Sequence, residues 1–226
     1  MKTFTEQLSL LSEGAISILD QSIALERYVR IDLSVDNEDL NTRDITDPVI
    51  CASYIDQQLA RHRGSVAYGG YLEKRNLYSD KEGFSGNALH QRNIHLGVDF
   101  WCAAGTKVQT PISGKVHSFK DNASVGDYGP TIIMEHQLVD EVFYTLYGHL
   151  SRTSLEGLFV GKKFIAGSVL GDLGTPEVNV NYAPHLHFQI IRDMKGYSGD
   201  YPGVCSQKNL AFYRKNCPDP NLLLKL

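Results

Sequence analysis

The chain has 226 residues, 42% hydrophobic and 21% charged, which is enough to bury the core of one domain with an extension. Its 22 lysines and arginines against 26 aspartates and glutamates give a net charge of −4, which argues against a nucleic-acid partner. No stretch has the roughly 18 apolar residues of a membrane helix, and no secretory signal is seen. The sequence therefore predicts a cytoplasmic protein with no membrane partner. Its four cysteines lack a CxxC pair and are expected to be free, although Cys205 and Cys217 could bond in an exported chain.

Two helices are predicted in the N-terminal third. Within residues 1–30, apolar side chains recur at steps of three and four, which is typical of one helix face: Phe4, Leu8, Leu11, Ala15 and Ile18. Asp47 followed by Pro48 predicts the start of a second helix, with Asp47 as the N-cap. This helix is expected to end near Gly64, which can serve as its C-cap. The polar residues 34–46 are read as a connection between the two helices.

From about residue 93 the pattern becomes that of an all-β domain, because short apolar runs alternate with glycine and proline turns. The predicted strands cover residues 131–138, 142–150, 162–173 and 186–191. A short helix is expected at 210–215, before two prolines. These patterns predict a mainly β (α+β) fold with a helical N-terminal extension.

Histidine spacing points to a metal site. In a strand, side chains alternate between faces, so His185, His187 and Gln189 would share one face. The other face would be apolar, carrying Leu186, Phe188 and Ile190. Two imidazoles on one face can bind a single ion, although two solvated histidines are the alternative interpretation.

Two further elements supply suitable chemistry. His95 and Asp99 would lie on one face of an extended segment. They are interpreted either as zinc ligands, for which a histidine nitrogen and a carboxylate oxygen are suitable, or as a hydrogen-bonded structural pair. His149 lies at the end of the predicted strand 142–150, where alternation places it on the same face as Tyr147. It is interpreted either as a catalytic acid or base or as a solvated residue at the rim of the sheet. Catalytic zinc needs three protein ligands and one open position, which His95, Asp99 and His187 can provide. The sequence has no HExxH motif, which excludes a zinc protease site built on a single helix.

These motifs, in this order, resemble the lysostaphin/LytM-type zinc metalloendopeptidases over about residues 90–192. The segments that carry the resemblance are His95-x-x-x-Asp99, Tyr147-Gly148-His149-Leu150, His185-x-His187 and the blocks 104–108, 111–116 and 160–171. The resemblance implies that His95, Asp99 and His187 bind zinc and that His149 and His185 are catalytic. It also implies an antiparallel LytM-like domain (duplicated hybrid motif) with a groove over its sheet.

The resemblance divides the chain into a helical extension (1–75), a LytM-like domain (76–198) and a C-terminal tail that packs on the domain (199–226). The flanks resemble the peptidase-like module of cytosolic aminotransferase fusion proteins. The oligomeric state is left open. Two positions depart from the family pattern, Tyr182-Ala183 before Pro184 and Gln189 after the second histidine. Both are expected beside the groove but not in contact with a metal ligand.

The implied reaction is hydrolysis of a peptide amide bond by a metal-activated water, on a peptide or peptidoglycan-like substrate. His185 is expected to be the general base and His149 the donor to the oxyanion, with the roles exchangeable. A non-catalytic metal-binding or activator module and a zinc amidase for a small cytosolic metabolite remain alternatives.

Other residues are expected to be peripheral. Those expected to be structural are His117 and His136, and His62 is expected to be solvated at a helix end. His90 could line the groove, and the segment 69–75 could form a loop over it.

Overall fold

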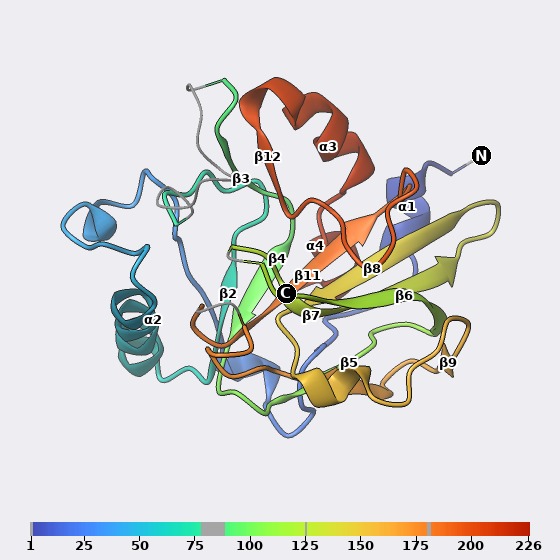
Figure 1. Ribbon diagram of the computed structural model, residues 1–226, viewed down its shortest axis with the longest axis horizontal. Helices are drawn as coiled ribbons and strands as arrows, with labels where there is room; N and C mark the ends of the chain where they lie inside the picture. The colour runs from blue at the N-terminus through green and yellow to red at the C-terminus, as the bar shows by residue number, and fades with distance from the viewer. Residues whose placement is uncertain (1, 78–88, 125, 180–181) are drawn as a thin grey trace.

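The computed structural model describes residues 2–77, 89–124, 126–179 and 182–226. Its main element is an eight-stranded sheet with strand order β1-β2-β4-β11-β8-β7-β6-β9 (Figure 1). These strands are β1 (Tyr28–Arg30), β2 (Val66–Gly69), β4 (Val98–Trp101), β6 (Gly114–Asn122), β7 (Gly129–Gln137), β8 (Val142–Gly148), β9 (Lys163–Phe164) and β11 (His185–Ile191). Every pair in it is antiparallel except β1 with β2, so the predicted mainly β, antiparallel fold is confirmed.

Two short ribbons flank the main sheet. Strand β5 (Lys107–Gln109) pairs with β10 (Val169–Asp172), and β3 (Arg92–His95) pairs with β12 (Val204–Ser206). The predicted strand 162–173 is therefore two strands, β9 and β10, that belong to different sheets. The β3–β12 ribbon carries the predicted ligand His95 and joins the C-terminal tail to the segment that precedes β4.

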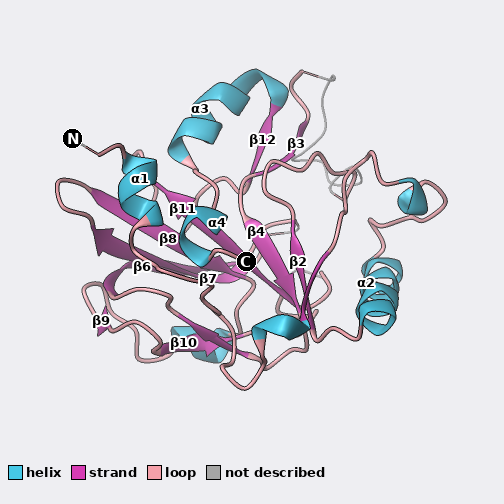
Figure 2. Cartoon of the chain, turned by 180° about the vertical axis from the view of Figure 1, so that it is seen from behind, coloured by secondary structure: helices cyan, strands magenta, loops and turns pink. Residues whose placement is uncertain are grey.

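The helices lie around the main sheet. They are α1 (Phe4–Ser9), α2 (Pro48–His62), α3 (Leu210–Asn216) and α4 (Asn221–Leu224). Seen from behind, α1 and α4 lie over β8 and β11, while α2 stands beyond β2 at the far end of the sheet (Figure 2). Phe4 and Leu8 of α1 and Leu223 and Leu224 of α4 are buried in the main core together with Phe188 of β11. Both ends of the chain thus close the same face of the sheet.

The first predicted helix is much shorter than its apolar spacing suggests. A capping box formed by Thr3 and Glu6 starts α1, and the helix ends at Ser9. Beyond it the chain turns toward α4, where the Ser12 hydroxyl donates to the Leu223 carbonyl at 2.6 Å. The prediction of a helical face reaching Ile18 is therefore wrong, because tertiary hydrogen bonds replace the helical ones. Ile18 is nevertheless buried in the main core.

The second predicted helix is confirmed, with a different end. The Asp47 carboxylate accepts hydrogen bonds from the amides of Val49 and Ile50 and so caps α2. At the other end it is Arg63, with φ 53°, that takes the left-handed cap conformation. Gly64 serves close packing instead, since a Cβ there would lie 2.4 Å from Cγ2 of Val29.

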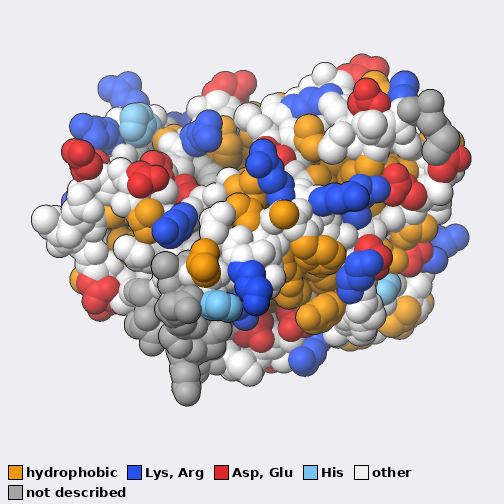
Figure 3. Space-filling model, turned by 90° about the horizontal axis from the view of Figure 1, so that it is seen from above, with side chains coloured by type: hydrophobic (Ala, Val, Ile, Leu, Met, Phe, Trp, Pro, Cys, Tyr) orange, Lys and Arg blue, Asp and Glu red, His pale blue; other side chains and the backbone are white. Residues whose placement is uncertain are grey.

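No helix among the described residues is both long and apolar enough to span a bilayer. On the face shown in Figure 3, lysine and arginine side chains are interspersed with aspartate and glutamate. This mixed surface agrees with the balanced composition of the chain.

Candidate metal centre and active site

The site is built across three neighbouring strands of the main sheet. In the strand register, His187 of β11 lies opposite Asp99 of β4 on one side and Gly148 of β8 on the other. The residues next to them, Val98, Phe100 and Phe188, point to the opposite face and are buried in the main core. The alternation predicted for β11 is thus observed, and its apolar face anchors the histidines.

His95 reaches this row from the separate ribbon. Residues 95–99 are not one continuous strand, because β3 ends at His95 and β4 begins at Val98. Gly97 lies between them, and a Cβ there would be 2.7 Å from Cε1 of the His187 ring. Glycine at this position lets the His187 ring pack against the connection between β3 and β4.

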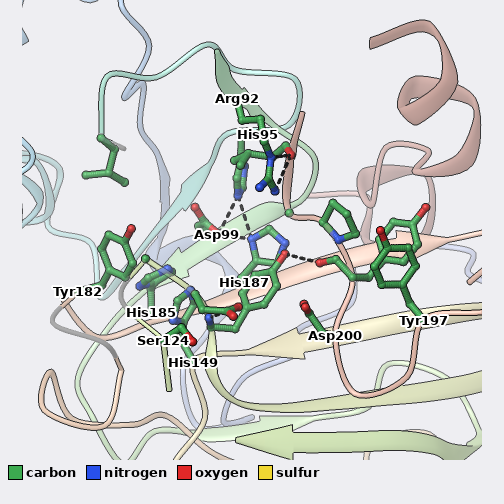
Figure 4. Close-up of a pocket in the computed structure, with 18 residues that line it drawn as sticks. Arg92, His95, Asp99, Ser124, His149, Tyr182, His185, His187, Tyr197 and Asp200 are labelled. Atoms are coloured by element: carbon green, nitrogen blue, oxygen red, sulfur yellow. Dashed lines mark hydrogen bonds and ion pairs between the residues drawn. The ribbon is translucent and has the colours of Figure 1, made fainter. Parts of the chain in front are cut away.

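The three predicted ligands lie together in the structure. Nε2 of His95 is 2.9 Å from Nδ1 of His187, and Oδ1 of Asp99 is 3.2 Å from the first nitrogen and 3.0 Å from the second (Figure 4). All three side chains are buried, and they are the one group of potential metal ligands found among the described residues. Ligand atoms at about 2.0–2.1 Å from a tetrahedral zinc ion are about 3.4 Å apart, so the spacing suits such an ion.

Hydrogen bonds on the far side of each ring fix which nitrogen faces the centre. Nδ1 of His95 lies 3.0 Å from the Gly70 carbonyl oxygen, which can only accept, so this nitrogen carries the proton. Nε2 of His187 lies 2.9 Å from Oε1 of Gln189. The Gln189 amide nitrogen in turn donates to the Pro202 carbonyl and to Sγ of Cys217, which sets the orientation of the amide. Gln189 therefore contacts a predicted ligand directly, and the expectation that it does not is wrong.

This arrangement points three lone pairs at one spot. Nε2 of His95, Nδ1 of His187 and Oδ1 of Asp99 are all acceptors there, so a cation between them is needed to offset their repulsion. Burial lowers the pKa of His95 to about 4, so His95 is not protonated at neutral pH. Burial opposes ionisation of Asp99, but the charge of the neighbouring Arg75 guanidinium favours it, and the pKa of Asp99 lies well below the usual range. The donor set fits a divalent metal ion.

A buried arginine completes the surroundings of Asp99. Nη1 of Arg75 lies 2.6 Å from Oδ2 of Asp99, while its Nε lies 2.5 Å from the Glu73 carboxylate. The guanidinium also stands over the Trp101 ring at 5.5 Å. Sequence reasoning expected a loop over the groove here but assigned Arg75 no role, because nothing in its local sequence shows that it meets Asp99.

His149 lies on the same face as the predicted metal ligands, not on the face of Tyr147 as alternation predicted. Strand β8 ends at Gly148, and His149 has a left-handed φ of 64°, which turns its side chain to the other face. Its backbone is held on both sides, since its amide donates to the Tyr128 carbonyl and its carbonyl accepts from the Gly174 amide. A side chain at Gly148 would collide with the Tyr128 ring, 2.8 Å from the Cβ position.

His185 lies beside His149, with ring centroids 4.0 Å apart. Its ring stacks on Trp101, and its Nδ1 donates to the Ala183 carbonyl at 2.7 Å. Burial lowers the pKa of both His185 and His149, the latter well below its usual range. Both imidazoles are therefore neutral at pH 7.

These five side chains open into a cavity of about 340 Å³. Figure 4 shows the predicted ligands and catalytic histidines on one side of it and Tyr197 and Asp200 on the other. Its lining also includes Tyr182, which is expected beside the groove, and residues that the sequence does not indicate: Arg92, Ser124, Asp127, Tyr128, Tyr197, Asp200 and Tyr201. Apart from Arg92, which begins β3, these residues come from loops and from the tail, where no spacing rule indicates which side chains face the cavity. Burial and the nearby Asp200 raise the pKa of Asp127.

The remaining histidines lie elsewhere. His136 is buried between the Ser113 carbonyl and the Thr145 hydroxyl, and His117 contacts Ser118. His62 is exposed in the last turn of α2. His90 is exposed and is not among the residues that line the cavity. All four cysteines are free thiols.

Two solved structures resemble the chain. The catalytic domain of the antimicrobial peptidase lysostaphin from Staphylococcus simulans is 26% identical, over 65% of this chain and 88% of that one, with a TM-score of 0.38. The catalytic domain of the prophage-encoded M23 protein EnpA from Enterococcus faecalis is 21% identical, over 60% and 88% of the two chains, with a TM-score of 0.39.

Sequence comparison points to one family. The chain is 33% identical over 102 residues to the DD-carboxypeptidase/endopeptidase Mpg of Neisseria meningitidis serogroup B, a match covering 45% of this chain. It spans about a fifth (21%) of the length of that relative. Residues 93–198, which contain all five side chains of the site, match the sequence model of peptidase family M23. Residues 93–198 are therefore similar to the domain of peptidase family M23.

Proposed function

We propose that this protein is a zinc metallopeptidase that hydrolyses a peptide amide bond. His95, Asp99 and His187 are the proposed zinc ligands, and His149 and His185 the proposed catalytic residues. The observation that carries the proposal is the convergence of three buried lone pairs, with the opposite ring nitrogens of both ligand histidines already hydrogen-bonded. Bound zinc would lower the pKa of water toward ~7 and polarise the scissile carbonyl.

The chain's own groups supply the proton transfer. Because Nδ1 of His185 donates to the Ala183 carbonyl, the Nε2 lone pair of this neutral ring is free to take a proton from the attacking water. His149, whose ring centroid lies 4.0 Å from that of His185, is placed to donate to the oxyanion once it carries a proton on Nε2. Arg75 offsets part of the charge of Asp99 and holds its second oxygen away from the metal centre.

The proposed substrate is a peptide or a peptidoglycan-like peptide. This rests on the family and on the Neisseria relative, whose name describes carboxypeptidase and endopeptidase activity. The cavity, bounded by tyrosines and by the tail segment around Asp200, is large enough for a few amino-acid residues. Asp127 and Asp200 line it together with Arg92, so a substrate with both amino and carboxylate groups fits its charges.

The test combines metal analysis with hydrolysis of peptidoglycan fragments and a dipeptide panel. We expect about one zinc per chain, lost in His187→Ala but retained in His149→Ala and His185→Ala. Each of the last two should lower the hydrolysis rate ~10²–10⁴-fold. Retention of zinc by His187→Ala would refute the ligand assignment. A metal-loaded protein that hydrolyses only small amides would favour the amidase alternative, and one that hydrolyses nothing would favour the binding module.

A further inference from the structure

A buried ring nitrogen of His149 and a buried amide oxygen of Asn179 are left without hydrogen-bond partners among the described residues. Nδ1 of His149 and Oδ1 of Asn179 are both buried, and neither has a hydrogen-bond partner within the described part of the chain. The exposed fractions of the two residues are 4% and 0%. Burial lowers the pKa of His149, while the nearby Asn179 side chain raises it, so the two side chains are neighbours. A buried polar atom without a hydrogen bond destabilises the fold, which favours pairing these two atoms.

The orientation of the Asn179 amide is not arbitrary. Its Nδ2 donates to the Ala183 carbonyl at 3.3 Å, and a carbonyl can only accept. Oδ1 must therefore be the atom on the other side of the amide, toward His149. The same Ala183 carbonyl accepts from Nδ1 of His185 at 2.7 Å, so Asn179 joins the supports of both histidines.

The backbone brings Asn179 to this place. Asn179 lies in a turn in which its backbone N–H donates to the Thr175 carbonyl. The backbone N–H of Gly174, at the start of that turn, donates to the His149 carbonyl. Gly129 permits the close approach: a Cβ there would lie 2.6 Å from the Val178 carbonyl oxygen. Asn179 is thus built into the same hydrogen-bonded framework that turns His149 toward the metal centre.

We propose that Asn179 is a positioning residue that holds His149 in the tautomer protonated on Nδ1, with Nε2 facing the cavity. The geometric part of this proposal is independent of the reaction, and the kinetic part rests on the proposed peptidase function. In the resting site both catalytic histidines then present a bare Nε2, so both are proton acceptors. His149 becomes a hydrogen-bond donor to the oxyanion only after its Nε2 takes up a second proton, supplied by bulk solvent, and Oδ1 of Asn179 stabilises that imidazolium.

The direct test is ¹⁵N NMR of the histidine side chains in the protein as purified. The chemical shifts of the two ring nitrogens report which one carries the proton. We expect His149 to be protonated on Nδ1, to lose this preference in Asn179→Ala, and to keep it in Asn179→Asp, whose carboxylate still accepts. His185 is the internal control, because its own bond to the Ala183 carbonyl remains in both variants.

The kinetic readout follows the same pair of variants. With zinc content unchanged, Asn179→Ala should lower kcat about 10–100-fold, the range found for loss of an outer-shell partner, with little change in KM. Asn179→Asp should recover most of that loss. A proton on Nε2 of His149 in the unsubstituted protein would overturn the proposal, and so would unchanged His149 shifts in Asn179→Ala. The first of these results needs no variant and no activity, so it separates failure of this inference from failure of the proposed function.

Discussion

Substitution of Gly97 by alanine tests how closely the metal centre depends on the connection between β3 and β4. The added Cβ would lie 2.6 Å from the Phe188 carbonyl oxygen and 2.7 Å from Cε1 of the His187 ring. The φ of Gly97 lies outside the left-handed region, so this contact and not backbone strain is the perturbation. Ordinary van der Waals contact begins at 3.4 Å, which requires the ring to move by about 0.7 Å.

This displacement exceeds what a metal site tolerates. A site must be held to within ≈ 0.5 Å of its productive geometry, and the His187 ring also loses its alignment with Gln189 when it moves. We expect zinc affinity to fall at least tenfold, and overpacking to lower the free energy of unfolding by about 1–3 kcal/mol.

Zinc affinity is measured by competition with a chromophoric chelator, and stability by urea unfolding of the metal-free protein. Gly14→Ala is the matched control, because the structure has nothing within 4 Å of its Cβ position. It should bind zinc normally and change stability by less than about 1 kcal/mol. If Gly97→Ala binds zinc as tightly as the unsubstituted protein, the assignment of His187 as a ligand in this geometry is refuted.

Three further predictions concern the metal and pH. Gln189→Leu removes the acceptor of the His187 ring and should weaken zinc binding about 10–100-fold, whereas Gln189→Glu keeps an acceptor and should stay close to normal in the same chelator competition. Chelation should leave the circular-dichroism spectrum of the fold intact, because apolar residues anchor both ligand strands. Restoring zinc to 100 times its Kd should stabilise the protein by about 2.7 kcal/mol, seen as a higher Tm; an unfolded chelated chain would contradict this. Burial lowers the pKa of His95 and His136 to about 4, below the value of 6.5 in the unfolded chain. Between these two pKa values the unfolded state therefore binds more protons than the folded state. The free energy of unfolding of the metal-free protein, measured in urea, should be highest above pH 6.5 and decrease as the pH falls toward 4. A free energy of unfolding that does not change with pH would show that these histidines are not buried in their neutral form.

The sequence by itself determined the β architecture and the chemistry of the site. Alternation in β11 places His185, His187 and Gln189 on one face, because the apolar residues between them must enter the core. The start of α2 follows from Asp47-Pro48, since capping and a fixed φ act locally. Such features depend on residues close in sequence, and so they can be recognised there.

The tertiary structure decided where these pieces meet. Packing against α4 ends the first helix at Ser9, although the apolar spacing continues to Ile18. His149 reaches the site through a left-handed conformation, which the alternation of β8 does not indicate. Arg75 meets Asp99 across 24 residues, Gln189 is oriented by the tail at Pro202, and Asn179 lies beside His149 through a turn. Each of these contacts joins segments far apart in the chain, and only the packing of the whole sheet sets their distance.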